Sequence, residues 1–201
     1  MVTLRTKNLS RTALGVGALG LALLPVASYA ATASTSNIQI SAAIGSAISI
    51  NTPTAVAVSL TPTSGGPVSI GSHTVTVSTN NSTGYKLYLK DADATLNLVS
   101  GINNITPTAG TAAAPAALTV MNTFGYAVAG APFAGTYTTG DNQVYDGTKT
   151  FAGITASDVQ IRNTATTATN ENTSVYWGVR ADTSLPNGTY VDNVIYSAIT
   201  N

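Results

Sequence analysis

The chain has 201 residues, a formal net charge of zero, only 8% charged residues and no cysteine. The absence of cysteine excludes a fold held by disulfide bonds, and the 44% hydrophobic content excludes the composition typical of disordered chains. The few basic residues are scattered along the chain, which argues against binding to a nucleic-acid backbone.

Residues 1–30 have the layout of a secretory signal peptide. Basic residues precede an apolar run, TALGVGALGLALL, that is shorter than the roughly 20 residues of a membrane-spanning helix. Small residues at Ser28 and Ala30 predict cleavage after Ala30, with Ala33 as the alternative. We therefore expect a secreted protein, extracellular or at the cell surface. Its mature chain carries five basic and eight acidic residues and no membrane span.

After the signal peptide, apolar residues alternate with polar ones, as in half-buried strands. The predicted strands are residues 37–44, 47–50, 56–60, 74–78, 85–89, 124–128, 158–161, 175–181 and 189–200. Clusters of Gly, Pro and Asn separate them, while residues 100–121 read as a long surface connection. We expect an all-β fold, a single antiparallel β-sandwich of Ig-like or jelly-roll-like type. An N-terminal strand segment would cover residues 31–53, and the sandwich domain residues 54–201.

The stretch YKLYLKDADATLNLV poses a choice between a metal site and a turn. Asp91 and Asp93 stand between two strand-like runs, YKLYL and LNLV, that we expect to pair as a hairpin. A calcium loop needs six to eight oxygen ligands, and the residues ATLNL that follow supply no further acidic group or glycine. The pattern therefore predicts a turn.

A second loop, GDNQVYDG, holds Asp141, Asn142 and Asp146 between glycines and is the better metal candidate. A simple hydrogen-bonded turn is the alternative there. His73 is the only histidine and opens the strand-like run HTVTV. The acidic residues fall in loops or at strand ends, and their spacing singles out no catalytic pair. We expect no enzymatic activity, no catalytic residue and no cofactor.

Three stretches occur in order along the chain: STNNSTGYKLYLKDADATLNL, NTFGYAV and WGVRADTSLPNGTYVDNVIYSAITN. They resemble a group of secreted bacterial β-sandwich surface proteins with the patterns TNNxTGYxLxL, NTWGYxV and PxGTYxxxVxYxAxxN. The chain is similar to WxL-type wall-associated modules of Gram-positive bacteria and to sandwich proteins displayed by small episymbiotic bacteria. The similarity covers residues 37–201, with Phe124 where tryptophan is usual. It implies a surface protein and carries over no catalytic residue.

The signature residues have physical roles within this pattern. They are Gly84, Tyr85, Phe124, Gly125, Tyr126, Trp177, Gly188, Tyr190 and Tyr196. Gly188 would supply the turn before the last strand, on which Tyr190, Val194, Tyr196 and Ala198 share an inward face. We expect Trp177, Phe124, Tyr126 and Tyr85 to form the aromatic centre of the core, with a glycan-stacking platform as the alternative.

The expected function is that of a non-enzymatic secreted cell-surface structural protein, with an adhesin or carbohydrate-binding module as the alternative. Residues 34–50, STSNIQISAAIGSAISI, alternate without a charge. An edge strand without lysine or proline lacks the usual protection against pairing with another chain. We hypothesise self-association through this segment by strand addition, with pairing inside the chain as the alternative. A cell-envelope or glycan partner is also compatible with the sequence.

Overall fold

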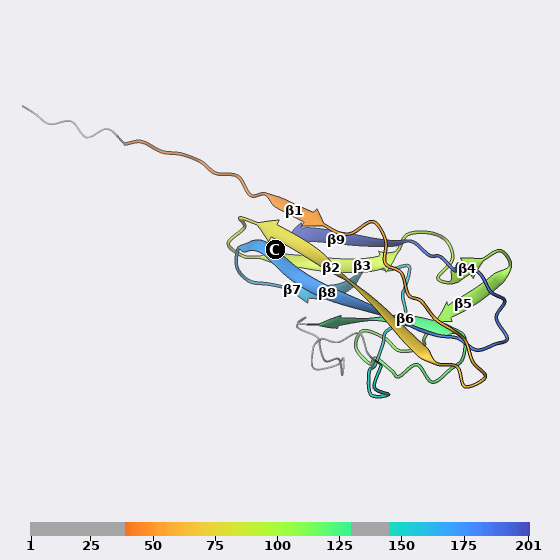
Figure 1. The fold of residues 1–201 in the computed structure, drawn as a ribbon. Coiled ribbons are helices and arrows are strands. Elements are labelled where there is room, and N and C mark those ends of the chain that lie inside the picture. Colours follow the sequence, from red (N-terminus) through yellow and green to blue (C-terminus); the bar gives the residue numbers. More distant parts are fainter. Residues whose placement is uncertain (1–38, 130–144) are drawn as a thin grey trace, which may run out of the picture. The chain divides into compact units, whose positions relative to one another are not determined.

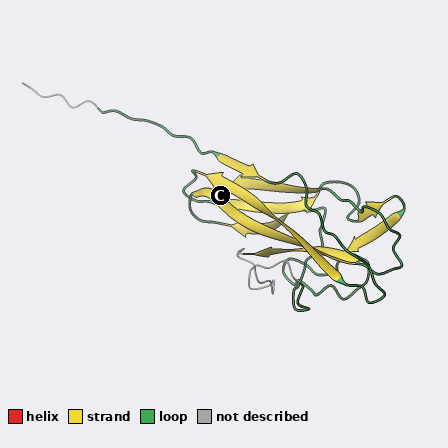
Figure 2. Cartoon of the chain, viewed as in Figure 1, coloured by secondary structure: helices red, strands yellow, loops and turns green. Residues whose placement is uncertain are grey.

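The computed structural model describes residues 39–129 and 145–201 (Figure 1). Within these residues the chain forms nine strands and no helix, which confirms an all-β fold for this part (Figure 2). Contacts divide the chain into Met1–Ala42 and a compact unit, Ala43–Asn201, that holds all nine strands. The predicted signal peptide lies outside the described residues.

The larger sheet has six strands in the order β1-β2-β8-β6-β5-β4. These are β1 (Ile48–Asn51), β2 (Val68–Thr79), β8 (Ala168–Arg180), β6 (Thr123–Ala129), β5 (Asn103–Pro107) and β4 (Leu98–Ser100). The long strands β2 and β8 pair antiparallel from Val68↔Arg180 to Thr79↔Ala168, and β6 pairs antiparallel with the other side of β8. Only β5 and β6 pair in parallel within this sheet.

The smaller sheet has three strands in the order β7-β3-β9. Its strands are β7 (Val159–Asn163), β3 (Tyr85–Asp91) and β9 (Val194–Thr200), all antiparallel. In β3 the alternation of the sequence is reproduced in burial: Tyr85, Leu87 and Leu89 are fully buried, while the residues between them are half-buried. The central strand therefore presents one apolar face to the core.

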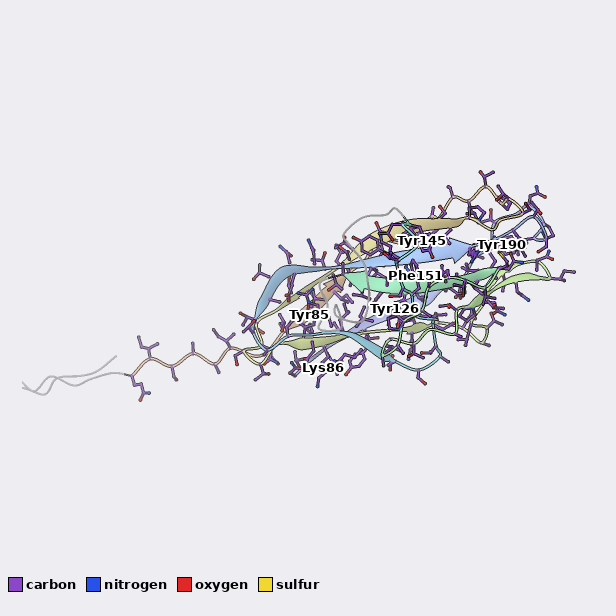
Figure 3. The ribbon with its side chains drawn as sticks, turned by 90° about the horizontal axis from the view of Figure 1, so that it is seen from below. Tyr85, Lys86, Tyr126, Tyr145, Phe151 and Tyr190 are labelled. Carbon is purple, nitrogen blue, oxygen red and sulfur yellow. The ribbon has the colours of Figure 1, made fainter. Side chains whose placement is uncertain are left out.

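Side chains from both sheets share one hydrophobic core (Figure 3). Its fully buried side chains include Val75, Val77, Tyr85, Leu87, Leu89, Tyr126, Phe151 and Val175. Trp177 on β8 stacks on Phe124, with ring centroids 6.4 Å apart, and lies 5.9 Å from Tyr126. Because no disulfide is present, burial of these apolar groups is the main stabilising term, at about 1.5–3 kcal/mol for each large side chain.

Two predicted strands are absent from the structure. Residues 39–47 are not in a strand, and β1 begins at Ile48 and pairs with β2 of the same chain. Residues 56–60 also form no strand, although their apolar side chains pack against the core. This segment lies against β2, where the Ser69 hydroxyl donates to the Ser59 carbonyl at 2.6 Å. The alternation of apolar and polar residues at 56–60 therefore reflects the burial of one face of this segment and not the pairing of its backbone in a sheet.

The expected hairpin between YKLYL and LNLV is wrong. β3 pairs with β7 and β9, whereas β4 pairs with β5 in the other sheet. Residues 92–97 therefore carry the chain from one sheet to the other. Residues 100–121 are more than a surface connection, since they contain β5 and the buried Leu118.

Two strand boundaries also differ from the prediction. β9 begins at Val194 and not at Thr189, and Val191 makes only an isolated bridge with Val99. His73 lies in the middle of β2, opposite Val175, instead of at the start of a strand. Serine and glycine residues in VSIGS extend β2 toward its N-terminus despite their low strand propensity, because the full-length partner β8 supplies the pairing.

Candidate functional site

The signature aromatic residues lie in the core and not around one reactive centre. Tyr85 and Tyr126 are 0% exposed, Phe124 is 2% exposed and Trp177 is 7% exposed. Every aromatic side chain within residues 39–129 and 145–201 is buried or half-buried. The described surface therefore offers no row of exposed rings of the kind that stacks on sugars.

The signature glycines allow close approach of neighbouring chain segments. Gly84 has φ +83°, and a Cβ there would lie 2.3 Å from the Thr164 carbonyl oxygen. A Cβ on Gly125 would lie 2.7 Å from the Ala152 carbonyl oxygen, and one on Gly188 would lie 2.8 Å from the Ser100 hydroxyl. These glycines are explained by packing alone.

The loop predicted to hold a metal is described only in part. Asp141 and Asn142 lie outside the described residues. Asp146 is exposed, and its Oδ1 accepts hydrogen bonds from the backbone N–H and the hydroxyl of Thr148, at 2.9 and 2.8 Å. These bonds lower the pKa of Asp146 because they stabilise the carboxylate. Asp146 thus forms a local hydrogen-bonded turn.

A groove of about 990 Å³ opens beside β9. One wall is residues 52–60, whose half-buried side chains are Val56, Val58 and Leu60. The other wall is residues 185–194, which lead into β9. Leu98, Ile105, Phe124, Trp177 and Val179 are the core side chains that contribute to its lining. The groove is mainly apolar and reaches the core.

Four titratable side chains contribute to the groove: His73 on β2, Tyr196 on β9, and Tyr190 and Asp192 in the segment before β9. His73 and Tyr196 are in direct contact. Their rings meet edge to face, with centroids 5.4 Å apart. Burial lowers the pKa of His73 and raises the pKa of Tyr196 far above its ordinary value, an increase that the Trp177 side chain partly opposes. The Nδ1 atom of His73 is buried without a hydrogen-bond partner in the described structure.

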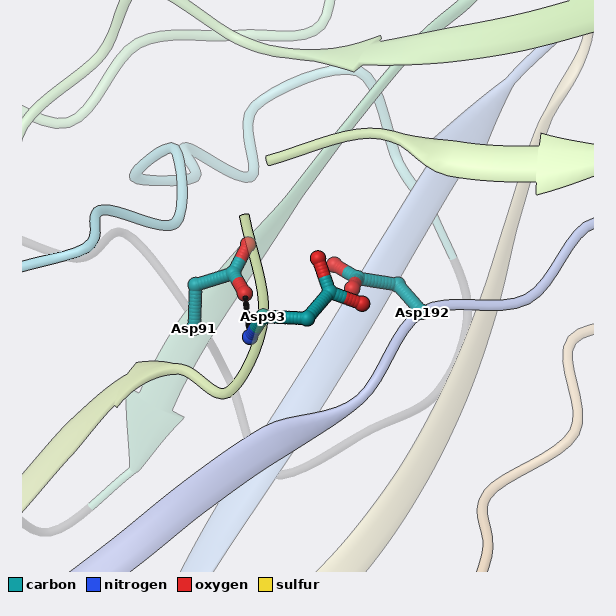
Figure 4. Close-up of side chains that lie close together, drawn as sticks. All are labelled: Asp91, Asp93 and Asp192. Carbon is teal, nitrogen blue, oxygen red and sulfur yellow. Dashed lines mark hydrogen bonds between the residues drawn. The ribbon is translucent and has the colours of Figure 1, made fainter. Parts of the chain in front are cut away.

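A cluster of three carboxylates lies at one end of the smaller sheet (Figure 4). Asp91 ends β3, Asp93 follows it in the turn, and Asp192 comes just before β9. One oxygen atom from each side chain lies within 4.8 Å of the others. We call these three residues the Asp cluster.

Local hydrogen bonds hold the Asp cluster in place. The Asp93 N–H donates to Asp91 Oδ1 at 2.7 Å, and the Thr95 N–H donates to Asp93 Oδ1 at 2.7 Å. These are the turn interactions predicted for the DADA sequence. The pairing of β3 with β9, together with an Ala92 N–H bond to the Asn193 carbonyl at 2.9 Å, then brings Asp192 to the same place.

Asp192 has an unusual electrostatic environment. Burial raises its pKa to about 6, and the negative charges of Asp91 and Asp93 contribute to the increase. Asp192 is not among the site residues predicted from the sequence, because no local pattern links it to the DADA turn. Asp192 could have been found only by predicting that the last strand pairs with YKLYL. That pairing would have placed Asp192 at the same end of the sheet as Asp91 and Asp93.

The part of the chain that the structure describes contains no helix with the length and hydrophobicity that a membrane span requires. Comparison of the chain with protein-family models, curated proteins and solved structures gives no match.

Proposed function

We propose that this chain is a non-enzymatic, secreted cell-surface structural protein that assembles through strand pairing between copies. Its two sheets would form one antiparallel β-sandwich of Ig-like or jelly-roll-like type. The donor would be the N-terminal segment that follows the predicted signal peptide, residues 31–47. The acceptor would be the groove beside β9 in a second copy.

One observation carries this proposal: the N-terminal segment exposes large apolar side chains. Ile40 is 93% exposed and Ile44 is 86% exposed. Two exposed isoleucines in a segment without a charged residue are costly to leave in water, at about 1.5–3 kcal/mol for each side chain that is left unburied. The segment therefore favours a partner that covers it.

The groove matches such a segment in chemistry. It is mainly apolar, and its lining includes Val194 and Tyr196 at the start of β9, which is an edge strand of the smaller sheet. In an extended segment Ile38, Ile40, Ala42 and Ile44 point to the same side, because side chains alternate with a period of two. That face would enter the groove, while the backbone of the donor pairs with an exposed strand edge. At about 3.3 Å per residue, the segment is long enough to reach a neighbouring molecule.

The mass of the purified protein in solution tests the proposal, by light scattering after size exclusion. We expect oligomers for the wild type and monomers for the double variant Ile40→Asp and Ile44→Asp, because charges on the inserted face cannot enter an apolar groove. The matched control is Gln39→Asp with Ala43→Asp, which adds the same two charges on the opposite face and should keep the oligomers. A wild type that stays monomeric at high concentration contradicts the proposal, as does equal assembly of both double variants.

The alternative function, an adhesin or carbohydrate-binding module, would use the same groove. Tyr190 contributes to the groove, and its hydroxyl donates to the Pro186 carbonyl at 3.0 Å. An aromatic ring at a groove is a common element of sugar sites. A monomeric wild type that binds cell-wall glycans, with binding lost in Tyr190→Ala, would favour this alternative.

A further inference from the structure

The Asp cluster contains two buried carboxylate oxygens without hydrogen-bond partners. Asp91 is only 4% exposed, and its Oδ2 is buried and accepts no hydrogen bond. The Oδ2 of Asp192 is buried and unpartnered in the same way. In Figure 4 the carboxyl groups of Asp93 and Asp192 face each other, and that of Asp91 lies beside them.

Nothing in the described structure neutralises this charge. The ion pairs among residues 39–129 and 145–201 are Lys90–Asp158 and Arg162–Glu171, and neither includes a member of the Asp cluster. The Oδ1 atoms of Asp91 and Asp192 each accept a backbone N–H bond at 2.7 Å, but their buried Oδ2 atoms accept none. A buried carboxylate oxygen without a partner is unfavourable unless the group takes up a proton or coordinates a cation. Three carboxylates that share one place increase that cost by mutual repulsion.

We propose that Asp91, Asp93 and Asp192 bind a calcium ion. Calcium is coordinated by carboxylate and carbonyl oxygens and by water at about 2.3–2.6 Å, so two of its ligands are at most about 5 Å apart. The three oxygens of the Asp cluster lie within 4.8 Å of one another and fit inside that shell. Asp91 supplies a buried oxygen, and the exposed Asp93 leaves room for water ligands.

The donor set disfavours other common ions. Zinc prefers histidine and cysteine, and the Asp cluster contains neither. Magnesium requires a near-ideal octahedron with ligands at about 2.0–2.1 Å and retains most of its water. The site is built from a turn and from a residue just before a strand that is distant in sequence, and three carboxylates supply its oxygens. Such a site suits calcium, which is larger than magnesium and accepts a more flexible coordination geometry.

The position of the site gives the ion a structural role. Asp91 ends β3, Asp93 belongs to the crossing between the two sheets, and Asp192 is two residues before β9. The ion would link the end of β3 to the start of the last strand, adding to the β3–β9 pairing that ends at Asp91↔Val194 and to the Ala92–Asn193 hydrogen bond beyond it. With only three protein carboxylates, the expected Kd is that of extracellular calcium modules, about 10⁻⁴–10⁻³ M.

Calorimetric titration of the purified, EGTA-treated protein with calcium chloride tests the proposal. We expect one ion per chain in the Kd range given above. At a tenfold excess over Kd the Tm should rise by about 3–6 °C, because the ion binds the folded state alone. Magnesium chloride at equal ionic strength should produce a much smaller shift.

Two variants locate the site. Asp192→Asn should abolish binding, and Asp93→Asn should weaken it about tenfold or more. Because Asp93 is exposed, the second variant keeps the test valid even if a change at Asp192 disturbs folding. The matched control is Asp146→Asn, which removes the same charge from the loop GDNQVYDG and should bind as the wild type does.

Three outcomes would overturn the proposal. One is the absence of binding heat and of a Tm shift at about 10 mM calcium, well above the range for extracellular modules. Another is binding by Asp93→Asn and Asp192→Asn that equals that of the wild type. The third is loss of binding in Asp146→Asn alone, which would assign the ion to residues 141–146.

Discussion

His73 on β2 and Tyr196 on β9 meet edge to face across the two sheets, with ring centroids 5.4 Å apart and ring planes at 69°. The contact joins the long central pair of the larger sheet to the last strand of the smaller one. Both side chains are also part of the groove lining. The protonation of His73 is therefore coupled to the packing between the sheets.

Stability should decrease in mild acid because of His73. Burial lowers its folded pKa below the ordinary histidine value of 6.5, so as the pH falls the unfolded chain takes up a proton first. The contribution of His73 to the free energy of unfolding is then complete above pH 6.5 and is lost as the pH falls from 6.5 through the lowered pKa. Urea unfolding between about pH 8 and pH 5 should show this loss in the wild type and not in His73→Gln.

The comparison with His73→Gln is needed because Asp192 titrates in the same range. Its pKa is raised to about 6, so its contribution has the opposite sign: it is present at low pH and is lost as the pH rises through 6. This effect is common to both proteins and cancels in their difference. A difference in unfolding free energy that does not change with pH would contradict the role given to His73.

Gly125 should not tolerate even a methyl group. A Cβ there would lie 2.7 Å from the Ala152 carbonyl, which accepts a hydrogen bond from the Tyr126 N–H at 2.8 Å. We expect Gly125→Ala to lower the free energy of unfolding by about 1–3 kcal/mol, the usual range for overpacking. Chemical denaturation measures the loss. Gly45→Ala, where no atom lies within 4 Å of the added Cβ, should have almost no effect.

Arg180 at the end of β8 should be an important structural residue. Its guanidinium donates to the carbonyls of Gly66 at 2.9 Å, Leu118 at 2.8 Å and Thr119 at 2.7 Å. It thus joins the turn before β2 to the segment before β6. Arg180→Gln should lower the free energy of unfolding by about 1.5–3 kcal/mol, as expected for hydrogen bonds from a charged group. Thermal or urea unfolding measures this change.

Lys90→Gln is the control for Arg180→Gln, since it removes the same charge. Lys90 pairs with Asp158 at 3.5 Å, and both side chains are partly exposed. Pairs of this kind contribute about 0–1 kcal/mol. Equal losses in the two variants would mean that the carbonyl contacts of Arg180 add nothing beyond its charge.

Trp177 should report global unfolding through its fluorescence. It is the only tryptophan of the chain and is 7% exposed between Phe124 and Tyr126. Its emission should move to longer wavelength on unfolding, together with the loss of the β-sheet signal in circular dichroism. Native emission at the wavelength of a water-exposed indole would contradict the burial described above.

Alternation of apolar residues correctly indicated the all-β class and most of the strands. In YKLYL, FGYAV and VYWGV the position of a residue along the strand decides which face its side chain occupies. This depends only on the neighbouring residues in the sequence, so it can be predicted without the tertiary structure. The same rule failed at residues 56–60, because an extended segment can bury one face through side-chain packing without a backbone partner. Alternation detects burial, whereas a strand also requires hydrogen bonds from elsewhere in the chain.

The sequence by itself therefore determined the strand-forming character of the chain and the aromatic residues available for its core. Only the tertiary structure decided which strands are neighbours. The backbone hydrogen bonds between two strands are the same whatever side chains the strands carry, so they do not show in the sequence which strands will pair. β3 pairs with β9 and not with the residues that follow it, and this pairing alone brings Asp192 to Asp91 and Asp93. The groove arises in the same way, from residues 52–60 and 185–194, which are distant in sequence and meet only when both sheets enclose the core.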